Sequence, residues 1–230
     1  MYRCVLLCSD HPVLAAEAET AARTCFDVRF VGRYPRDRKT VPPELVTTLG
    51  AQTVDFLFNY LSPIILPPGV LGALRRASVN FHPAPPEWPG VGSASYALYA
   101  GDAAFGATAH LMTEKPDAGA ILRVRRFPVA PDDTCERLFD RALAETLVLF
   151  KELLPEIART GQPVPNGEAW ARKAITRAQF ERWMTLPPDA PPEEVRRKVR
   201  ALRHSRFPGP FVELAGVRFA LPPDPKLRRP

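Results

Sequence analysis

The chain has 230 residues, of which 46% are hydrophobic and 24% are charged, as is ordinary for a globular domain. This length favours one large domain, or one domain with a small appendage, that buries its core without disulfides or metal ions. No apolar run approaches the roughly 20 residues of a membrane span. The N-terminus "MYRCVLLCSDH" is typical of a first strand rather than a signal peptide, so we expect a cytoplasmic protein.

The net charge of +6 is concentrated in the C-terminal quarter of the chain. Residues 171–230 hold 14 Lys and Arg against 6 Asp and Glu, whereas residues 1–170 hold 17 against 19. This asymmetry indicates either contact with an anionic partner or a basic surface that is simply solvated, and both remain open.

The four cysteines form no CxxC pair and no cluster with histidine. Cys4 and Cys8 have an even spacing on one predicted strand, so both side chains point to the same face. We therefore expect reduced thiols in the core and no metal site.

The first 82 residues alternate apolar strand-like runs with short helical patterns. Strands are predicted over 3–9, 26–32, 54–60 and 78–82, and helices over 11–24, 42–50 and 67–76. This order predicts an α/β fold with a mostly parallel, doubly wound sheet that has helices on both faces. Ligands bind such sheets at the carboxyl ends of the strands.

The rest of the chain is predicted to complete this sheet and to add a small extension. The elements are a helix over 94–102, strands over 105–114 and 120–129, and a long helix from Asp133 to about residue 159 with Glu136 as its capping-box partner. The apolar stripe of that helix is predicted to be core: Leu138, Phe139, Leu143, Leu147, Phe150, Leu153, Leu154 and Ile157.

The texture changes after Gly161. Loops and a short helix lead to a basic amphipathic helix in "EEVRRKVRALRH", and a hairpin over 210–221 turns at Ala215 and Gly216. The last residues, "PPDPKLRRP", are typical of a frayed tail. We therefore predict a main domain over 1–165 and a small basic C-terminal extension with a helix and a hairpin over 166–230.

Several common sites are missing from the sequence. No G-x-G-x-x-G or Walker A pattern follows the first strand, which disfavours NAD and ATP. G-x-S-x-G is absent as well, which disfavours a serine hydrolase.

Asn80 and His82 are two residues apart at the end of a predicted strand, so they share one face. An Asn amide can donate to a developing oxyanion, and the loss of one such donor costs about 2.7–4 kcal/mol of barrier. A histidine can shuttle a proton, and Asp117, in a turn between Pro and Gly, can orient it. Because 35 residues separate His82 from Asp117, spacing alone also allows an ordinary strand-end histidine.

Two long motifs add a resemblance. "VNFHPAPPEWPG" and "YALYAGDAAFGATAHLMTEKPDAGAIL" resemble the formyltransferases that use 10-formyltetrahydrofolate, as does "DFLFNYLSPIILPPGVL". The family pattern is a strand with N-x-H-P, then G-D-x-x-x-G-x-T-x-H-x-M, then an Asp-x-Gly turn. The match spans roughly residues 54 to 160, so it is specific for the family.

The resemblance implies that residues 1–165 form a catalytic domain. An acceptor amine would attack the formyl carbon, Asn80 and protonated His82 would stabilise the tetrahedral intermediate, and Asp117 would pair with His82 and help remove the amine proton. No metal is needed. His110 is expected to be structural. The folate is expected at Asn59, Tyr60, Ser62, Ile64, Ile65, Leu66, Thr113, Glu114 and Asp117, with backbone groups of Tyr60, Ile64 and Leu66 holding the pterin. The acceptor is expected at Pro83, Trp88, Gly90 and Tyr96.

The acceptor is the open question. Many relatives carry a basic residue after the His-Pro loop, where this chain has "PEWPG", and only about 60 residues follow position 170, too few for the C-terminal barrel of the tRNA enzymes. The "HPAPPEWPG" form and the ending "FPGPFVELAGVRF" resemble sugar N-formyltransferases. The resemblance implies a nucleotide-linked amino sugar as acceptor, whose phosphates the basic extension would bind, and no nucleic acid.

Four alternatives stay open. In the first the acceptor would be another amine or a hydroxylamine, and in the second it would be methionyl-tRNA. The same residues also suit a formyltetrahydrofolate hydrolase, although those relatives usually begin with a regulatory domain. A non-catalytic anion-binding protein is the least favoured. Because a lone hairpin is marginally stable, we also expect a homodimer through the C-terminal segment.

Overall fold

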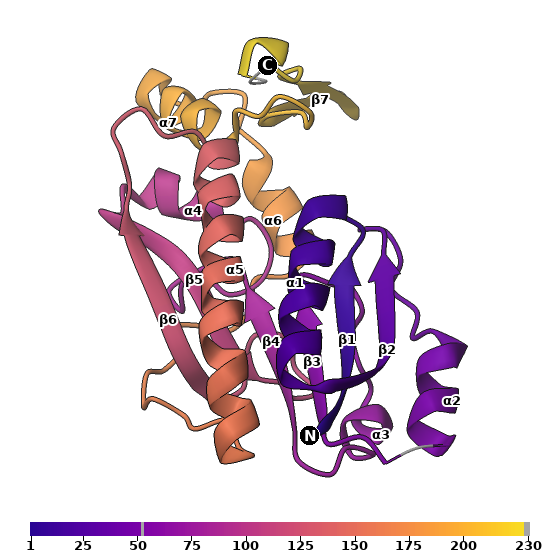
Figure 1. The fold of residues 1–230 in the computed structure, drawn as a ribbon. Coiled ribbons are helices and arrows are strands. Elements are labelled where there is room, and N and C mark those ends of the chain that lie inside the picture. Colours follow the sequence, from indigo (N-terminus) through magenta and orange to yellow (C-terminus); the bar gives the residue numbers. More distant parts are fainter. Residues whose placement is uncertain (52, 228–230) are drawn as a thin grey trace.

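The computed structural model describes residues 1–51 and 53–227 and contains one six-stranded sheet (Figure 1). The strand order is β2-β1-β3-β4-β5-β6. The strands are β1 (Arg3–Ser9), β2 (Asp27–Tyr34), β3 (Phe56–Tyr60), β4 (Ala77–His82), β5 (Ala104–Leu111) and β6 (Ile121–Pro128). The pairs β2–β1, β1–β3 and β3–β4 are parallel, and β5 pairs antiparallel with both β4 and β6. The predicted α/β class is confirmed.

Seven helices and a hairpin surround this sheet in the described part of the chain. They are α1 (Pro12–Cys25), α2 (Pro43–Ala51), α3 (Pro68–Leu71), α4 (Ser93–Ala100), α5 (Cys135–Thr160), α6 (Arg177–Met184) and α7 (Pro192–Leu202), with β7 (Phe211–Leu214), β8 (Val217–Ala220) and a 3-10 turn over Pro225–Leu227. The predicted tail lies partly outside the described residues. None of the described helices is long and apolar enough to cross a membrane.

Helix α3 is shorter than the predicted helix over 67–76. It ends after Leu71, and the amide of Gly72 caps it on the Pro68 carbonyl. The amides of Arg75 and Arg76 instead bond to the carbonyls of Val54 and Asp55, which starts β4 beside β3. Chain pairing therefore overrides the local helical pattern.

The two faces of the parallel half have different coverings (Figure 1). Helices α1 and α5 cover one face, where Phe81 and Phe150 meet edge to face at 4.7 Å between ring centroids. Helices α2 and α3 cover the other face through Leu45 and Val70. Burying each such side chain contributes about 1.5–3 kcal/mol. Because Val79 and Phe81 point to α5, the alternation along β4 turns Asn80 and His82 to the opposite face.

Cys4 and Cys8 are completely buried in the core cluster beneath α1 and α5, as the spacing predicts. Both thiols are free, and burial raises the pKa of each to about 12. They are packed as small apolar side chains rather than as nucleophiles.

The predicted capping box at Asp133 is wrong. The N-cap of α5 lies one residue later than predicted, at Thr134, whose side chain accepts from the Arg137 amide. The Asp133 carboxylate instead accepts from the Ala130 amide, and Glu136 accepts from Ser205 of the extension. Long-range partners have replaced the local box.

The C-terminal extension packs over the α4 end of the main domain, at the top of Figure 1. Trp183 of α6 contacts Tyr96 of α4 at 4.3 Å between centroids. The hairpin turns at Ala215 and Gly216, both with positive φ, as predicted. Positive φ at both central residues suits the twist of a two-residue hairpin.

Candidate functional site

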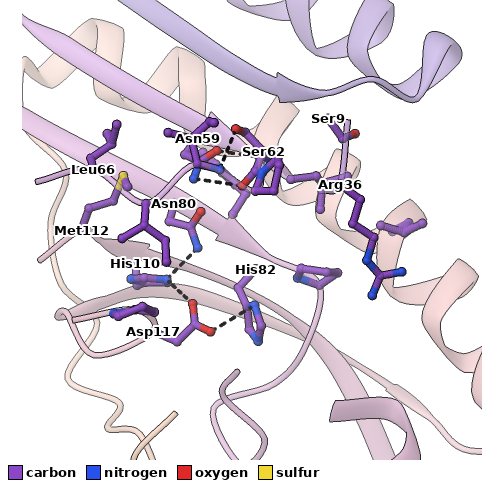
Figure 2. A pocket seen from close by; sticks show the side chains of 18 of the residues that line it. Ser9, Arg36, Asn59, Ser62, Leu66, Asn80, His82, His110, Met112 and Asp117 are labelled. Carbon is purple, nitrogen blue, oxygen red and sulfur yellow. Dashed lines mark hydrogen bonds and ion pairs between the residues drawn. The ribbon is translucent and has the colours of Figure 1, made fainter. Parts of the chain in front are cut away.

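A cavity of about 470 Å³ opens at the carboxyl ends of β1, β3 and β4 (Figure 2). Asn59, Asn80 and His82 project into it from the face of the sheet opposite α5. Phe139 and Leu143 of α5, predicted as core, also line it. The pocket therefore lies where parallel sheets bind ligands.

Three polar residues lie side by side across adjacent strands. Asn59 pairs with Asn80 in the β3–β4 register, and Asn80 pairs with His110 in the β4–β5 register. The Asn59 side chain is turned to the loop, where its Oδ1 accepts from the Ser62 amide at 3.1 Å. Asn80 Nδ2 lies 3.0 Å from His110 Nε2. The sheet thus fixes a polar row along one edge of the cavity.

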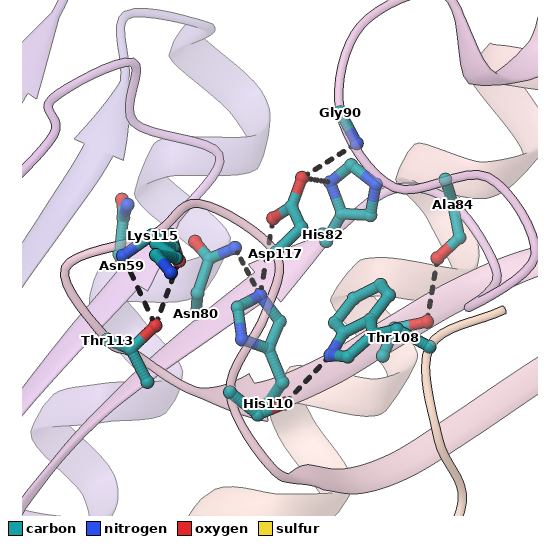
Figure 3. Close-up of polar contacts among 12 residues, drawn as sticks. Asn59, Asn80, His82, Ala84, Gly90, Thr108, His110, Thr113, Lys115 and Asp117 are labelled. Carbon is teal, nitrogen blue, oxygen red and sulfur yellow. Dashed lines mark hydrogen bonds and ion pairs between the residues drawn. The ribbon is translucent and has the colours of Figure 1, made fainter. Parts of the chain in front are cut away.

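Asp117 completes this arrangement from the turn after β5 (Figure 3). Its Oδ2 lies 3.5 Å from His82 Nδ1, and its Oδ1 lies 3.3 Å from His110 Nε2. The Gly90 amide donates to Oδ2 at 2.9 Å. The structure therefore brings Asn80, His82 and Asp117 together although 35 residues separate the last two.

The backbone is strained at two points of this site. Asp117 has φ +44°, and Leu61, directly after β3, has φ +61°. Such angles are uncommon for residues other than glycine, and they cluster at functional sites because surrounding contacts must hold them.

The carboxylate and the imidazole perturb each other. Burial alone raises the pKa of Asp117, but the charges of His82 and His110 and the Gly90 amide outweigh it and hold this pKa well below its ordinary value. Burial lowers the pKa of His82, and the Asp117 carboxylate opposes that effect. Asp117 is therefore ionised at neutral pH, and its charge favours the imidazolium form of His82 that burial disfavours. The buried Nε2 of His82 forms no hydrogen bond with the described residues. The nearby main chain of Trp88 acts to raise the pKa of His82.

His110 has a closer relation to this group than the sequence indicates. Its Nδ1 donates to the Leu111 carbonyl at 2.8 Å, and its Nε2 lies within hydrogen-bonding reach of both Asn80 Nδ2 and the Asp117 carboxylate. The contact with His110 orients the Asn80 amide and leaves its second N–H for another acceptor. The position of His110 opposite Asn80 in the β4–β5 pairing would have identified it. That pairing is known only once the sheet has been described.

Trp170 is a second residue that sequence reasoning missed. It lies in the segment after α5, and its Nε1 donates to the Gly119 carbonyl at 2.8 Å. Its ring meets His110 edge to face at 5.0 Å and His82 at 6.2 Å between centroids. No local pattern links it to residues over 50 positions earlier. The predicted domain boundary at 165/166 thus falls just before a segment that covers the site.

Most of the residues expected to hold folate line the cavity: Asn59, Ser62, Ile64, Ile65, Leu66, Thr113 and Asp117. Tyr60 does not, since its ring packs against Phe150 on the opposite face. Glu114 lies outside the lining and is exposed. The peptide groups of Leu66 make no hydrogen bond to other described residues.

The residues expected to hold the acceptor are more dispersed. Pro83 lines the cavity. Trp88 and Tyr96 stack at 5.6 Å, and Trp88 is further held by Asp102 and by Arg172, whose guanidinium carbon lies 4.0 Å from its ring centroid. Gly90 acts through its amide on Asp117. In the described structure Trp88 and Tyr96 anchor the loop rather than line the pocket.

Gly90 lies in the loop after His82, and we expect Gly90→Ala to weaken both the fold and the site. Its φ is +90°, and a Cβ would lie 2.3 Å from the Ile175 carbonyl oxygen, in a β-bridge that joins the loop to the extension. Strain alone costs about 1–3 kcal/mol, which lowers the Tm by roughly 2–4 °C for each kcal/mol. Calorimetry measures the Tm.

Gly167→Ala is the matched control for Gly90→Ala. Gly167 has φ +86°, but a Cβ there meets nothing within 4 Å. The difference between the two variants therefore isolates the clash with Ile175. Equal losses of Tm in both would show that the bridge to Ile175 is unimportant.

Within residues 1–51 and 53–227, no group of three or more His, Cys, Asp or Glu side chains is arranged to hold a metal ion. The polar groups that line the cavity include amide donors, three imidazoles and the buried carboxylate of Asp117. This donor set can stabilise a developing oxyanion and move a proton.

Comparison with known proteins gives one family. The protein-family model described as "Formyl transferase" matches residues 3–153 of the chain. The chain is 30% identical over 196 residues to a methionyl-tRNA formyltransferase of Burkholderia multivorans, which covers 83% of this chain. The chain spans only 57% of that relative's length.

Two solved structures share the fold. A sugar N-formyltransferase from Shewanella sp FDAARGOS_354 superposes with a TM-score of 0.73 at 17% identity, covering 95% of this chain and 96% of that chain. An N-formyltransferase from Helicobacter canadensis, in complex with folinic acid and dTDP-3-aminofucose, gives 0.66 at 14% identity, with coverages of 94% and 85%.

Proposed function

Because this chain belongs to the formyl transferase family, we propose that it moves a formyl group from 10-formyltetrahydrofolate to the amine of a small acceptor, a nucleotide-linked amino sugar, in the cytoplasm. The observation that carries the proposal is the group formed by Asn80, His82 and Asp117 at the cavity. The family gives the reaction, and these residues supply the groups that it needs.

The chemistry follows from where these groups point. A bond forms between the acceptor nitrogen and the formyl carbon, and the formyl oxygen gains negative charge. The free N–H of Asn80 and the imidazolium form of His82 donate to that oxygen. Asp117 stabilises the imidazolium and takes up the amine proton, directly or through water. When the bond from the formyl carbon to the folate nitrogen breaks, that nitrogen takes up the proton removed from the amine, and tetrahydrofolate leaves from the formamide product.

The far end of the cavity suits a flat ring with polar edges. Ile64, Leu66 and Met112 supply apolar walls, and the free peptide groups of Leu66 can bond to the edge of a pterin. Thr113 lies beside them. The folinic acid in the Helicobacter canadensis relative supports a folate as formyl donor.

The nucleotide-sugar acceptor has separate support. The two sugar N-formyltransferase-type structures align with nearly the whole of this chain, extension included, and one of them was crystallised with dTDP-3-aminofucose. Methionyl-tRNA is the second candidate, because eight curated relatives at 29–31% identity are methionyl-tRNA formyltransferases.

The decisive experiment supplies 10-formyltetrahydrofolate and measures tetrahydrofolate release with no acceptor, with a panel of amino-sugar nucleotides and small amines, and with methionyl-tRNA. Release that depends on an amino-sugar nucleotide supports the proposal. Dependence on methionyl-tRNA or another amine moves the acceptor to that class. Release of formate without acceptor identifies a hydrolase, and no release under any condition rejects the enzyme.

The hairpin supports a homodimer. Val212, Leu214, Val217 and Phe219 share one face by register, and the last three are 48–57% exposed. A two-stranded hairpin is marginal alone, so we propose that a second copy covers this face. Phe219→Glu is expected to convert a dimer to a monomer in sedimentation velocity, with Arg218→Glu, on the other face, as control. A monomeric parent protein contradicts this.

A further inference from the structure

Two cations, Arg36 and Arg206, line the cavity, and two more, Lys39 and Arg177, lie near Arg36. We call Arg36, Lys39, Arg177 and Arg206 the cationic rim. They come from the loop after β2, from the first turn of α6 and from the loop after α7. Three separate segments, two of them in the extension, thus place like charges together.

Burial and neighbouring positive charges both act on two groups of the rim. Burial lowers the pKa of Arg36, and the charges of Arg177 and Arg206 lower it further. Burial likewise lowers the pKa of Lys39, and Arg177 and Arg36 add to this effect. The rim therefore holds several positive charges that repel one another.

Few acids offset this charge. Among the described residues no carboxylate forms a salt bridge with Arg36, Lys39 or Arg177, and Arg206 has only Glu136, at 3.7 Å. Asp37 lies near Lys39, and Asp10 lines the cavity. By contrast, Arg125 and Arg126 elsewhere on the surface each bond to two glutamates. A cluster of positive charges with few neighbouring carboxylates favours the binding of an anion.

The rim opens into the candidate active site. Arg36 and Arg206 both line its cavity. Figure 2 shows Arg36 and Ser9 on the side away from Leu66 and Met112, with His82 and Asp117 between. Arg36 is also placed over the Phe207 ring, at 5.5 Å to the centroid, which restricts its side chain.

We propose that the cationic rim binds the phosphate groups of the acceptor, a nucleoside diphosphate-linked sugar, and so directs its amine to His82. This rests on the proposed function for the identity of the acceptor. The pterin is assigned to the Leu66 side, so the second substrate approaches from the Arg36 side. Guanidinium groups form paired, charge-assisted hydrogen bonds with phosphate oxygens, and three arginines from different segments match a diphosphate better than a single carboxylate.

Inorganic pyrophosphate is the probe for the rim, and calorimetric titration of the full chain measures its affinity without any turnover. Arg36→Gln and Arg206→Gln are each expected to weaken pyrophosphate binding by about tenfold, since each removes a charge-assisted hydrogen bond. Arg75→Gln is the matched control, because exposed Arg75 directly precedes β4, at the amino ends of the parallel strands and away from the cavity. Wild-type affinity in both rim variants, or an equal loss in the control, would overturn the proposal.

Kinetics separate this proposal from the proposed function. With an accepted amino-sugar nucleotide, Arg36→Gln should raise the acceptor KM about tenfold at unchanged kcat. An unchanged KM sinks the phosphate site while the formyltransferase stands. If no amino-sugar nucleotide is accepted, but pyrophosphate binding still depends on Arg36, the proposed acceptor fails and the anion site stands.

Folinic acid distinguishes the other anionic substrate, because its glutamate tail carries carboxylates. The rim variants are expected to bind folinic acid as tightly as the parent protein. A loss of folinic acid affinity with pyrophosphate binding retained would assign the rim to the folate tail and overturn the proposal.

Discussion

His82→Ala is expected to lower kcat for formyl transfer by a factor of about 10² to 10⁴. The variant removes the imidazole that faces Asp117 and whose Nε2 is buried without an ordinary hydrogen bond. Folate binding should be little changed, because the assigned pterin contacts lie on the Leu66 side of the cavity. Tetrahydrofolate formation at saturating substrates measures the loss, and titration with folinic acid measures retained binding.

His204→Ala is the matched control for this variant. His204 lies outside the cavity lining and pairs with Glu136 at 3.7 Å. Its kcat should therefore equal that of the parent protein. Near-normal turnover in His82→Ala, with an unchanged Tm, would show that the assignment of the reacting centre is wrong.

Asp117→Asn is expected to lower kcat by a comparable factor of about 10² to 10⁴. The substitution keeps the size of the side chain and can still accept the Gly90 amide, but it removes the negative charge between His82 and His110. Asp117→Glu, which restores the charge at a different reach, should recover part of the activity. An Asn variant as active as the parent protein would exclude Asp117 from the reaction.

The same variant should change the pH profile in a defined direction. The Asp117 carboxylate raises the pKa of His82 against the lowering effect of burial. Without this charge the imidazolium is less stable, so the pKa of His82 falls further. In the proposed mechanism the imidazolium is the active form, so the pH above which kcat/KM declines should move to a lower value. A decline at unchanged or higher pH would contradict the role assigned to His82.

Stability should respond to pH through the same pair. The folded-state pKa of Asp117 lies below its ordinary value of 3.8, so its ionised form stabilises the fold above that pH and this contribution is lost as the pH falls through the folded value. His82 acts in the same direction, because its folded pKa is lowered and protonation at acid pH favours the unfolded chain.

Local pattern was sufficient for much of the fold and for half of the candidate site. The alternation in "SVNFH" places Asn80 and His82 on one face, and the sheet has them there. The paired strands and helices of the first 82 residues follow from apolar periodicity and turn residues. The motifs after His82 identified the family, which the family model confirms.

The features that could not be predicted depend on contacts between residues that are far apart in the sequence. The proximity of Asp117 to His82 requires the β4–β5 pairing, which also places His110 beside Asn80. Thr134 caps α5 because Asp133 and Glu136 have partners elsewhere. Trp170 and the cationic rim come from segments that meet only after the extension packs, and no spacing rule encodes that meeting.

The position of Trp170 has a consequence for the order of folding. The pocket is built from β4 and its loop, from the turn at Asp117, and from a segment that follows the long helix α5. Closing such long stretches of chain costs entropy before any contact forms, and contacts of large sequence separation slow folding. We therefore expect the sheet and α5 to assemble first. Trp170 then covers the imidazoles of His82 and His110 only when the extension docks. A molecule halted before that step would have native strands and an open, wet reaction centre.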